Sequence, residues 1–115
     1  MENYLEQEGP VAVALEIVPK KVFLEWLNNI EKELDLEPTD YDVLLSETNV
    51  YLVSLDSYED EIEDYIDEHF ENIFKNELET WSLEVEKWPH GRNLEMFEEW
   101  FDYKVHNLIN MLKVE

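Results

Sequence analysis

The stretch that most constrains the fold is residues 57–79, SYEDEIEDYIDEHFENIFKNELE, in which apolar and acidic residues are interleaved. The apolar side chains recur at steps of three or four residues, which places them along one face of an α-helix. This pattern predicts a helix of about six turns that must bury its apolar face. Asp56 or Ser57 can cap its first turn by accepting hydrogen bonds from free backbone N–H groups. The apolar face consists of Tyr58, Ile62, Tyr65, Ile66, Phe70, Ile73, Phe74 and Leu78.

The same stretch carries ten carboxylates and one lysine. Five pairs of acids lie four residues apart, and such like-charge pairs together destabilise a helix by about 1–2.5 kcal/mol. Burial of the apolar face contributes on the order of 10 kcal/mol, so we expect the helix to form. The acids are either a solvated helix face or a docking surface for a partner. The candidate partner-binding carboxylates are Glu59, Asp60, Glu63, Asp64, Asp67, Glu68 and Glu71.

The segments before this helix predict a strand and another helix. Residues 11–18, VAVALEIV, are mostly β-branched and aliphatic, which is typical of a strand buried on both faces. Pro19 suits the first position of a helix, where its missing N–H costs nothing, and Pro38 would end that helix. Between the two prolines the apolar residues follow helical spacing: Phe23, Trp26, Leu27, Ile30 and Leu34.

The segment VLLSETNVYLVSLD predicts a β-hairpin. Residues 43–45 and 50–55 are strand-like, and the polar residues 46–49 between them favour a turn. One longer, bent strand is the alternative.

Residues 80–115 predict a loop or edge strand followed by a last helix. Trp81, Leu83 and Val85 alternate with polar residues, as in a half-buried edge strand. A loop anchored by tryptophan explains this segment nearly as well. Asn93 is a suitable cap for the helix that follows. The inward face of that helix would be Leu94, Phe97, Trp100, Phe101, Val105, Leu108, Ile109 and Leu112.

The predicted order β-α-β-β-α-(β)-α indicates an α+β fold. We expect residues 1–9 to be a polar tail and residues 10–115 to be one domain, with three amphipathic helices packed on a small, mostly antiparallel sheet. The chain is 44% apolar and 13% aromatic, which is too rich for a disordered acidic tail.

The net charge of −22 limits the possible partners. Binding to nucleic acid requires lysines and arginines that displace counterions from phosphates, so we expect none. The acidic surface should instead attract cationic partners. No apolar run approaches the roughly 18 residues that span a bilayer. With no cysteine and no signal-peptide pattern at the N-terminus, we expect a cytoplasmic protein without membrane contact.

Residues 87–93, KWPHGRN, form the other unusual segment, because they hold the one arginine of the chain beside a tryptophan. The structural interpretation is a turn that starts the last helix, with Trp88 anchoring it. The functional interpretation is a recognition loop in which Trp88 and Arg92 contact a partner. Arg92 can equally form an ion pair with the acidic helix.

No catalytic or metal-binding motif is present. The chain lacks a G-x-S-x-G nucleophile elbow, a P-loop and a His-Glu-x-x-His pair, and two glycines could not build a phosphate-binding loop. Asp102 and His106 would lie one turn apart on the last helix, which is more typical of a surface ion pair than of a metal site. We therefore expect no metal ligands and no cofactor.

These observations favour a non-enzymatic module that binds a protein with a basic surface. One alternative is a nucleic-acid mimic that inhibits a basic DNA-binding protein. Its ten carboxylates would span about 34 Å of helix, close to the roughly 3.4 Å phosphate spacing of one DNA strand. The other alternative is an enzyme or metal site built from carboxylates. The chain would be a monomer or a homodimer, the latter through a stripe of Met96, Tyr103 and His106 on the last helix.

Overall fold

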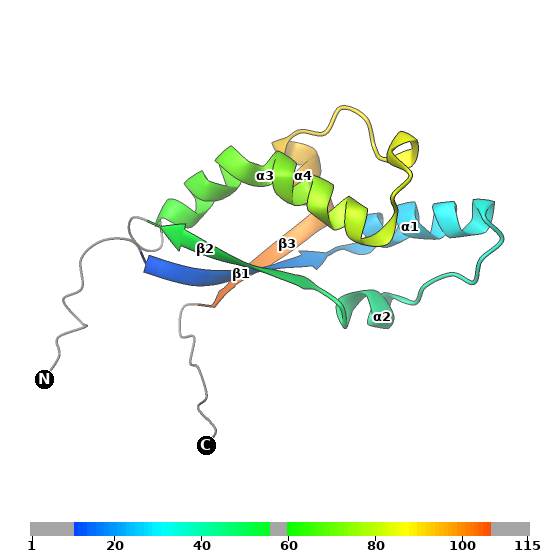
Figure 1. Ribbon diagram of the computed structural model, residues 1–115, viewed down its shortest axis with the longest axis horizontal. Coiled ribbons are helices and arrows are strands. Elements are labelled where there is room, and N and C mark those ends of the chain that lie inside the picture. Colours follow the sequence, from blue (N-terminus) through cyan, green and yellow to red (C-terminus); the bar gives the residue numbers. More distant parts are fainter. Residues whose placement is uncertain (1–10, 56–59, 107–115) are drawn as a thin grey trace, which may run out of the picture.

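The computed structural model describes residues 11–55 and 60–106 of the 115-residue chain (Figure 1). The predicted tail, the caps Asp56 and Ser57, and residues 107–115 lie outside the described residues. The elements are β1 (Val11–Pro19), α1 (Lys21–Glu33), α2 (Tyr41–Leu45), β2 (Asn49–Leu55), α3 (Asp60–Trp81), the 3-10 turn η2 (Val85–Lys87), α4 (Leu94–Trp100) and β3 (Phe101–His106).

The sheet has three strands in the order β2-β1-β3, and both pairings are antiparallel. The central strand is therefore β1, with Leu15 opposite Tyr51 on one side and Val105 on the other. Helices α3 and α4 lie on the same side of this sheet (Figure 1). The predicted α+β class with an antiparallel sheet is confirmed.

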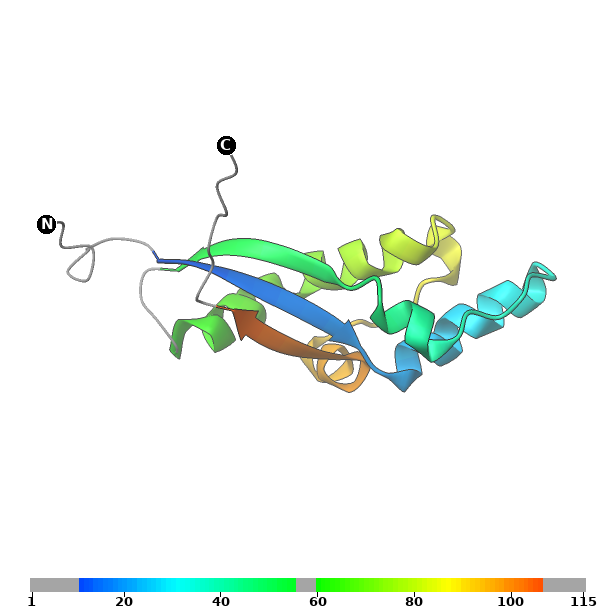
Figure 2. The same ribbon diagram turned by 90° about the horizontal axis from the view of Figure 1, so that it is seen from below.

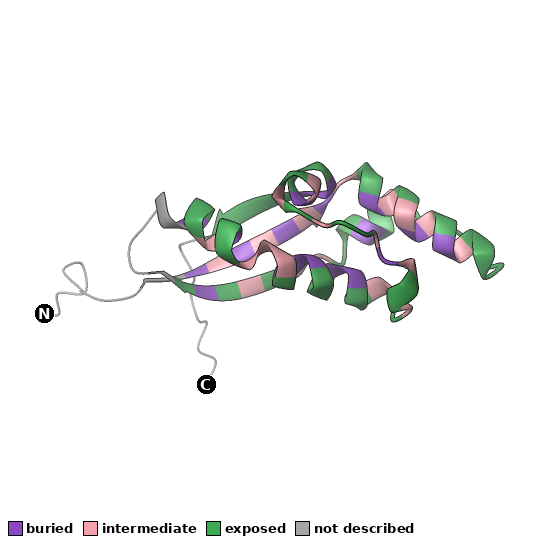
Figure 3. Cartoon of the chain, turned by 90° about the horizontal axis from the view of Figure 1, so that it is seen from above, coloured by how far each residue is buried: buried purple, intermediate pink, exposed green. Residues whose placement is uncertain are grey.

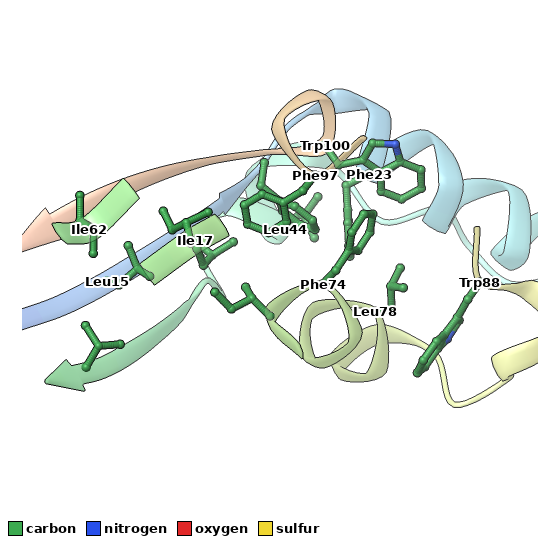
Figure 4. Close-up of a cluster of buried hydrophobic side chains, with 14 of the residues drawn as sticks. Leu15, Ile17, Phe23, Leu44, Ile62, Phe74, Leu78, Trp88, Phe97 and Trp100 are labelled. Atoms are coloured by element: carbon green, nitrogen blue, oxygen red, sulfur yellow. The ribbon is translucent and has the colours of Figure 1, made fainter. Parts of the chain in front are cut away.

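The core lies between the sheet and α3. Val13, Leu15 and Ile17 of β1 are fully buried, and residues of α3 cover them (Figure 4). The predicted apolar face of α3 is confirmed where it is described, because its members are buried or half-buried. Toward α1 and α4 the core becomes an aromatic cluster with edge-to-face and tilted contacts, formed by Phe23, Phe74, Phe97, Trp100 and Phe101.

The other face of the sheet is much more open. Ala14, Glu16 and Val18 of β1 are half-buried on this face, whereas Val50 and Leu52 on β2 are 57% and 75% exposed. The predicted burial of residues 11–18 on both faces is therefore wrong in part. Only alternate residues of β1 contact the core, as expected for a strand whose successive side chains point to opposite faces.

The predicted hairpin is wrong, as is the single bent strand. Residues 43–45 belong to helix α2, and β2 pairs with β1 instead. A short apolar run does not distinguish a strand from a helix. The helix places Leu44 in the core, and it lets the Tyr41 hydroxyl group donate a 3.0 Å hydrogen bond to the carbonyl group of Pro19.

The predicted last helix is also wrong beyond Trp100, where the chain turns into strand β3. Phe101 and Val105 lie four residues apart, a spacing that fits both a helix face and alternate strand positions. The strand is favoured because β1 has a second edge, and every residue of β3 pairs with β1 along that edge. Leu108, Ile109 and Leu112 of the predicted inward face lie outside the described residues.

Smaller differences concern the other boundaries. Pro19 ends β1, so α1 begins at Lys21. The alternating segment around Leu83 is a loop with a 3-10 turn, and Leu83 and Val85 are 76% and 61% exposed. Among the described residues, no helix is long and apolar enough to cross a membrane.

Candidate functional site

The acidic face of α3 consists of four carboxylates, Glu63, Asp64, Asp67 and Glu68, all of which are exposed. They fall on one side of the helix because they form two adjacent pairs spaced four residues apart, which is close to one turn of 3.6 residues. Buried and exposed residues alternate along this helix, so its charged side faces away from the core (Figure 3). Asp60 begins α3, but its side chain and the whole of Glu59 lie outside the described residues.

Glu71 differs from the acidic face, although it continues the row of Glu63 and Asp67. It is half-buried, and its Oε2 atom accepts a 2.9 Å hydrogen bond from Nη2 of Arg92. The Nζ atom of Lys75 lies 3.9 Å from the same oxygen. These two cations neutralise Glu71, so the acidic face ends one turn before it.

A cleft of about 410 Å³ lies beside the acidic face, between α3, α4 and β3. Such a volume is within the range of about 300–1,000 Å³ that is typical of binding clefts. Three buried apolar side chains, Ile66, Phe97 and Phe101, belong to its lining. The polar lining residues are Glu63, Asp67, Glu98, Asp102, Lys20 and Tyr103.

The cleft is negatively charged, with four carboxylates against one lysine. That lysine, Lys20, already has partners, because its Nζ atom donates a 2.8 Å hydrogen bond to the Glu98 carbonyl group and lies 3.7 Å from Oδ1 of Asp102. Burial raises the pKa of Tyr103, and the charges of Glu63 and Glu98 raise it further. The hydroxyl group of Tyr103 therefore keeps its proton to a higher pH than usual, and it can donate a hydrogen bond from the lining of the cleft.

The sequence did not predict Glu98, Asp102 and Tyr103 as partner-binding residues. The sequence places all three on one predicted helix, whereas the structure places Glu98 on α4 and the other two on β3. Their convergence with α3 depends on the change from helix to strand at Phe101. The sequence does contain a signal for this change, because Phe101, Tyr103 and Val105 alternate with polar residues, as in a strand.

The loop of residues 87–93 is held from inside the molecule. Trp88 is only 8% exposed, and its indole N–H donates a 3.1 Å hydrogen bond to the carbonyl group of Ser82. Arg92 donates to the Pro89 carbonyl group as well as to Glu71. The two side chains stabilise the loop and join it to α3, and the structure does not bring them together with the acidic face.

His69 and His106 both make contacts at the protein surface. The ring of His69 packs against Tyr65 with 4.3 Å between centroids, and Nε2 of His106 lies 3.1 Å from Oε1 of Glu16. Asp102 and His106 lie on a strand, so the predicted one-turn pair on a helix is wrong. In the described part of the chain, no group of three or more His, Asp or Glu side chains could hold a metal ion.

Comparisons with known protein families, with curated proteins and with solved structures found no match to this chain. The acidic face and the cleft are therefore the basis for inferring a function.

Proposed function

We propose that this protein is a non-enzymatic binding module that recognises a protein partner with a basic surface. The observation that carries this proposal is the shared position of Glu63 and Asp67. Both belong to the exposed acidic face of α3, and both also line the cleft opposite Glu98 and Asp102. A surface that attracts a cationic protein therefore leads directly into a hollow that can hold one of its side chains.

The cleft matches the two parts of an arginine or lysine side chain. Such side chains place their aliphatic stems along apolar surface and keep the charged head group at a polar boundary. Ile66, Phe97 and Phe101 supply the apolar surface, and the carboxylates around them supply acceptors for the head group. Hydrogen bonds between charged groups are stronger than neutral ones, and arginine can bind a carboxylate through two N–H groups.

The net charge of −22 has a separate role in this proposal. Long-range attraction raises the rate at which a basic partner meets the protein, and it weakens as salt is added. The cleft then provides specificity at short range. A cytoplasmic location and the absence of a cofactor stay predictions from the sequence.

The nucleic-acid mimic is less well supported. A mimic needs one continuous row of carboxylates, whereas Arg92 and Lys75 neutralise Glu71 within the row of α3. Beyond that point Glu77 is buried, and Lys75 interrupts the row before the exposed Glu79.

The proposed function is tested with a short arginine-rich peptide and isothermal titration calorimetry. We expect binding in about 0.1 M salt that weakens strongly toward about 1 M, where the Debye length falls from about 10 Å to about 3 Å. Glu98→Gln should weaken binding by about three- to tenfold, because it removes one charged acceptor of the cleft. Glu95→Gln is the matched control, since Glu95 is exposed on the same helix and is not among the cleft residues.

Two results would overturn the proposal. One is the absence of binding to the basic peptide at low salt. The other is equal weakening by Glu98→Gln and Glu95→Gln, which would show that only total charge matters and that the cleft contributes nothing.

A further inference from the structure

Strand β2 is one edge of the sheet, and its sequence NVYLVSL contains no charged residue. Within the described part of the chain, β2 pairs only with β1, so its outer edge has no strand partner (Figure 2). The opposite edge differs sharply, because β3 carries Asp102, Lys104 and His106. The uncharged edge therefore stands out in a chain with a net charge of −22.

Edge strands in monomeric proteins are usually protected against pairing with other chains by charges, by proline, by a bulge or by short length. None of these features is present in β2. Its seven residues pair with β1 in an unbroken register, from Asn49 opposite Ile17 to Leu55 opposite Val11. Leu52 at its centre and Val50 are the exposed apolar residues of the open sheet face, at 75% and 57%.

We propose that β2 pairs with the β2 strand of a second copy of this chain, forming an antiparallel homodimer with a continuous six-stranded sheet. The absence of charge on β2 permits a second copy as the occupant, and the residue pairs that such a dimer would form argue for it. Two molecules with a net charge of −22 repel each other over most of their surfaces, so an uncharged strand is where they can approach most closely.

The strand is also self-complementary. In an antiparallel pair centred on Leu52, the two Leu52 residues lie opposite each other on the open face of the sheet. Tyr51 then lies opposite Val53 of the second copy, and Val50 lies opposite Ser54. Each pair is apolar or uncharged, and such cross-strand pairs of aromatic and β-branched residues stabilise a sheet. A twofold axis closes the assembly, so it stops at a dimer.

The dimer is independent of the proposed function, because it uses the opposite edge of the sheet. The cleft includes Tyr103 and Asp102 of β3, which β1 separates from β2. A β2-mediated dimer would leave both acidic faces free. It also replaces the stripe of Met96, Tyr103 and His106 as the route to a dimer, since those residues do not share one helix.

The test is sedimentation velocity over a range of protein concentrations in about 0.1 M and about 1 M salt. We expect the dimer fraction to rise with salt, because screening reduces the repulsion between two acidic molecules. Leu52→Lys should raise the dimer dissociation constant by at least about tenfold, since it places two like charges opposite each other at the dimer axis. Leu83→Lys is the matched control, because Leu83 is 76% exposed but lies outside the sheet.

Circular dichroism first establishes that each variant is folded, and Val50→Lys replaces Leu52→Lys if the latter is not. Hydrogen exchange gives an independent measurement, in which protection of β2 amides should increase with protein concentration. A protein that is monomeric at every concentration and salt level overturns the proposal. So does a dimer that Leu83→Lys weakens as much as Leu52→Lys, or one that weakens as salt is added.

Discussion

The hydroxyl group of Tyr51 donates a 2.7 Å hydrogen bond to Oε2 of Glu77, the one buried charged side chain among the described residues. The same oxygen accepts a 2.9 Å hydrogen bond from the side-chain amide group of Asn49. Two residues of β2 therefore hold a carboxylate of α3 that is only 3% exposed. Burial raises the pKa of Glu77, and the hydrogen bonds from Tyr51 and Asn49 oppose that rise in part.

The raised pKa of Glu77 predicts that the free energy of unfolding depends on pH. In the unfolded chain this carboxyl group loses its proton near its ordinary pKa of 4.5, whereas in the folded protein it holds the proton to a higher pH. Its contribution to stability is thus present in full below 4.5 and is lost as the pH rises through the folded pKa. Glu77→Gln removes this titration, so the free energy of unfolding of the variant relative to the wild type should be higher at pH 7 than at pH 4.

Urea unfolding at both pH values measures this difference. Glu79→Gln is the control, because Glu79 is exposed two residues further along α3. An equal effect of pH on the two variants would contradict the assignment to Glu77.

Leu78 tests the packing of α3 against the sheet. It is fully buried in the core, so Leu78→Ala should lower the free energy of unfolding by about 2–5 kcal/mol through lost burial and the cavity left behind. Leu83→Ala should change it by no more than about 0.5 kcal/mol, because Leu83 is 76% exposed. Denaturant titration of both variants makes the comparison, and similar losses would show that α3 does not pack as described.

The acidic face should make the protein more stable in salt. Glu63 and Asp67 lie four residues apart, as do Asp64 and Glu68, so screening relieves repulsion within α3. Glu68→Lys replaces the second repulsive pair by an attractive one, with the acid on the N-terminal side, and should stabilise the protein by about 0.4–1 kcal/mol. Thermal unfolding at low and high salt measures both effects. The gain from Glu68→Lys should shrink as salt is added, and a gain that is independent of salt would exclude an electrostatic cause.

Asn93 should set the stability of α4, whose residue Glu98 lines the cleft. Its Oδ1 atom accepts a 2.8 Å hydrogen bond from the backbone N–H group of Met96, which confirms the predicted cap. Asn93→Ala should cost about 1 kcal/mol, and Asn93→Ser should recover most of that loss, since serine also accepts at this position. Chemical denaturation of the three proteins tests the order, and equal losses from both substitutions would argue against the capping hydrogen bond.

The sequence predicted the elements whose periodicity is long and unambiguous. The apolar spacing in α3 persists over many turns, and no strand could bury Ile66, Ile73 and Phe74 on one face, because neighbouring residues of a strand point to opposite faces. Val13, Leu15 and Ile17 of β1 were placed correctly in a buried strand for a similar reason. The α+β class follows because a clearly predicted helix and a clearly predicted strand must bury their apolar faces against each other.

The sequence did not predict the elements whose apolar spacing fits both a helix and a strand. In these segments, contacts with the rest of the protein decide which of the two forms. Residues 43–45 and Phe101–His106 are short, and their structures depend on what β1 and the core require. The acidic half of the candidate site was visible because it lies on α3 alone. The cleft could not be predicted from the sequence, because Glu98 and Asp102 approach α3 only when the chain leaves α4 and pairs with β1.

The position of β1 at the centre of the sheet has a consequence for how the chain acquires its structure. β1 is the first described element, and its partner β3 is the last, so Pro19 meets Phe101 only after most of the chain has been made. Contacts between residues so distant in sequence slow folding, because a large loop must close before they form. During synthesis β1 can pair first only with β2. The other edge of β1, at Leu15 and Ile17, has no strand partner until β3 has been made. The late arrival of that strand also completes the cleft, so a nascent chain acquires its acidic face before its candidate pocket.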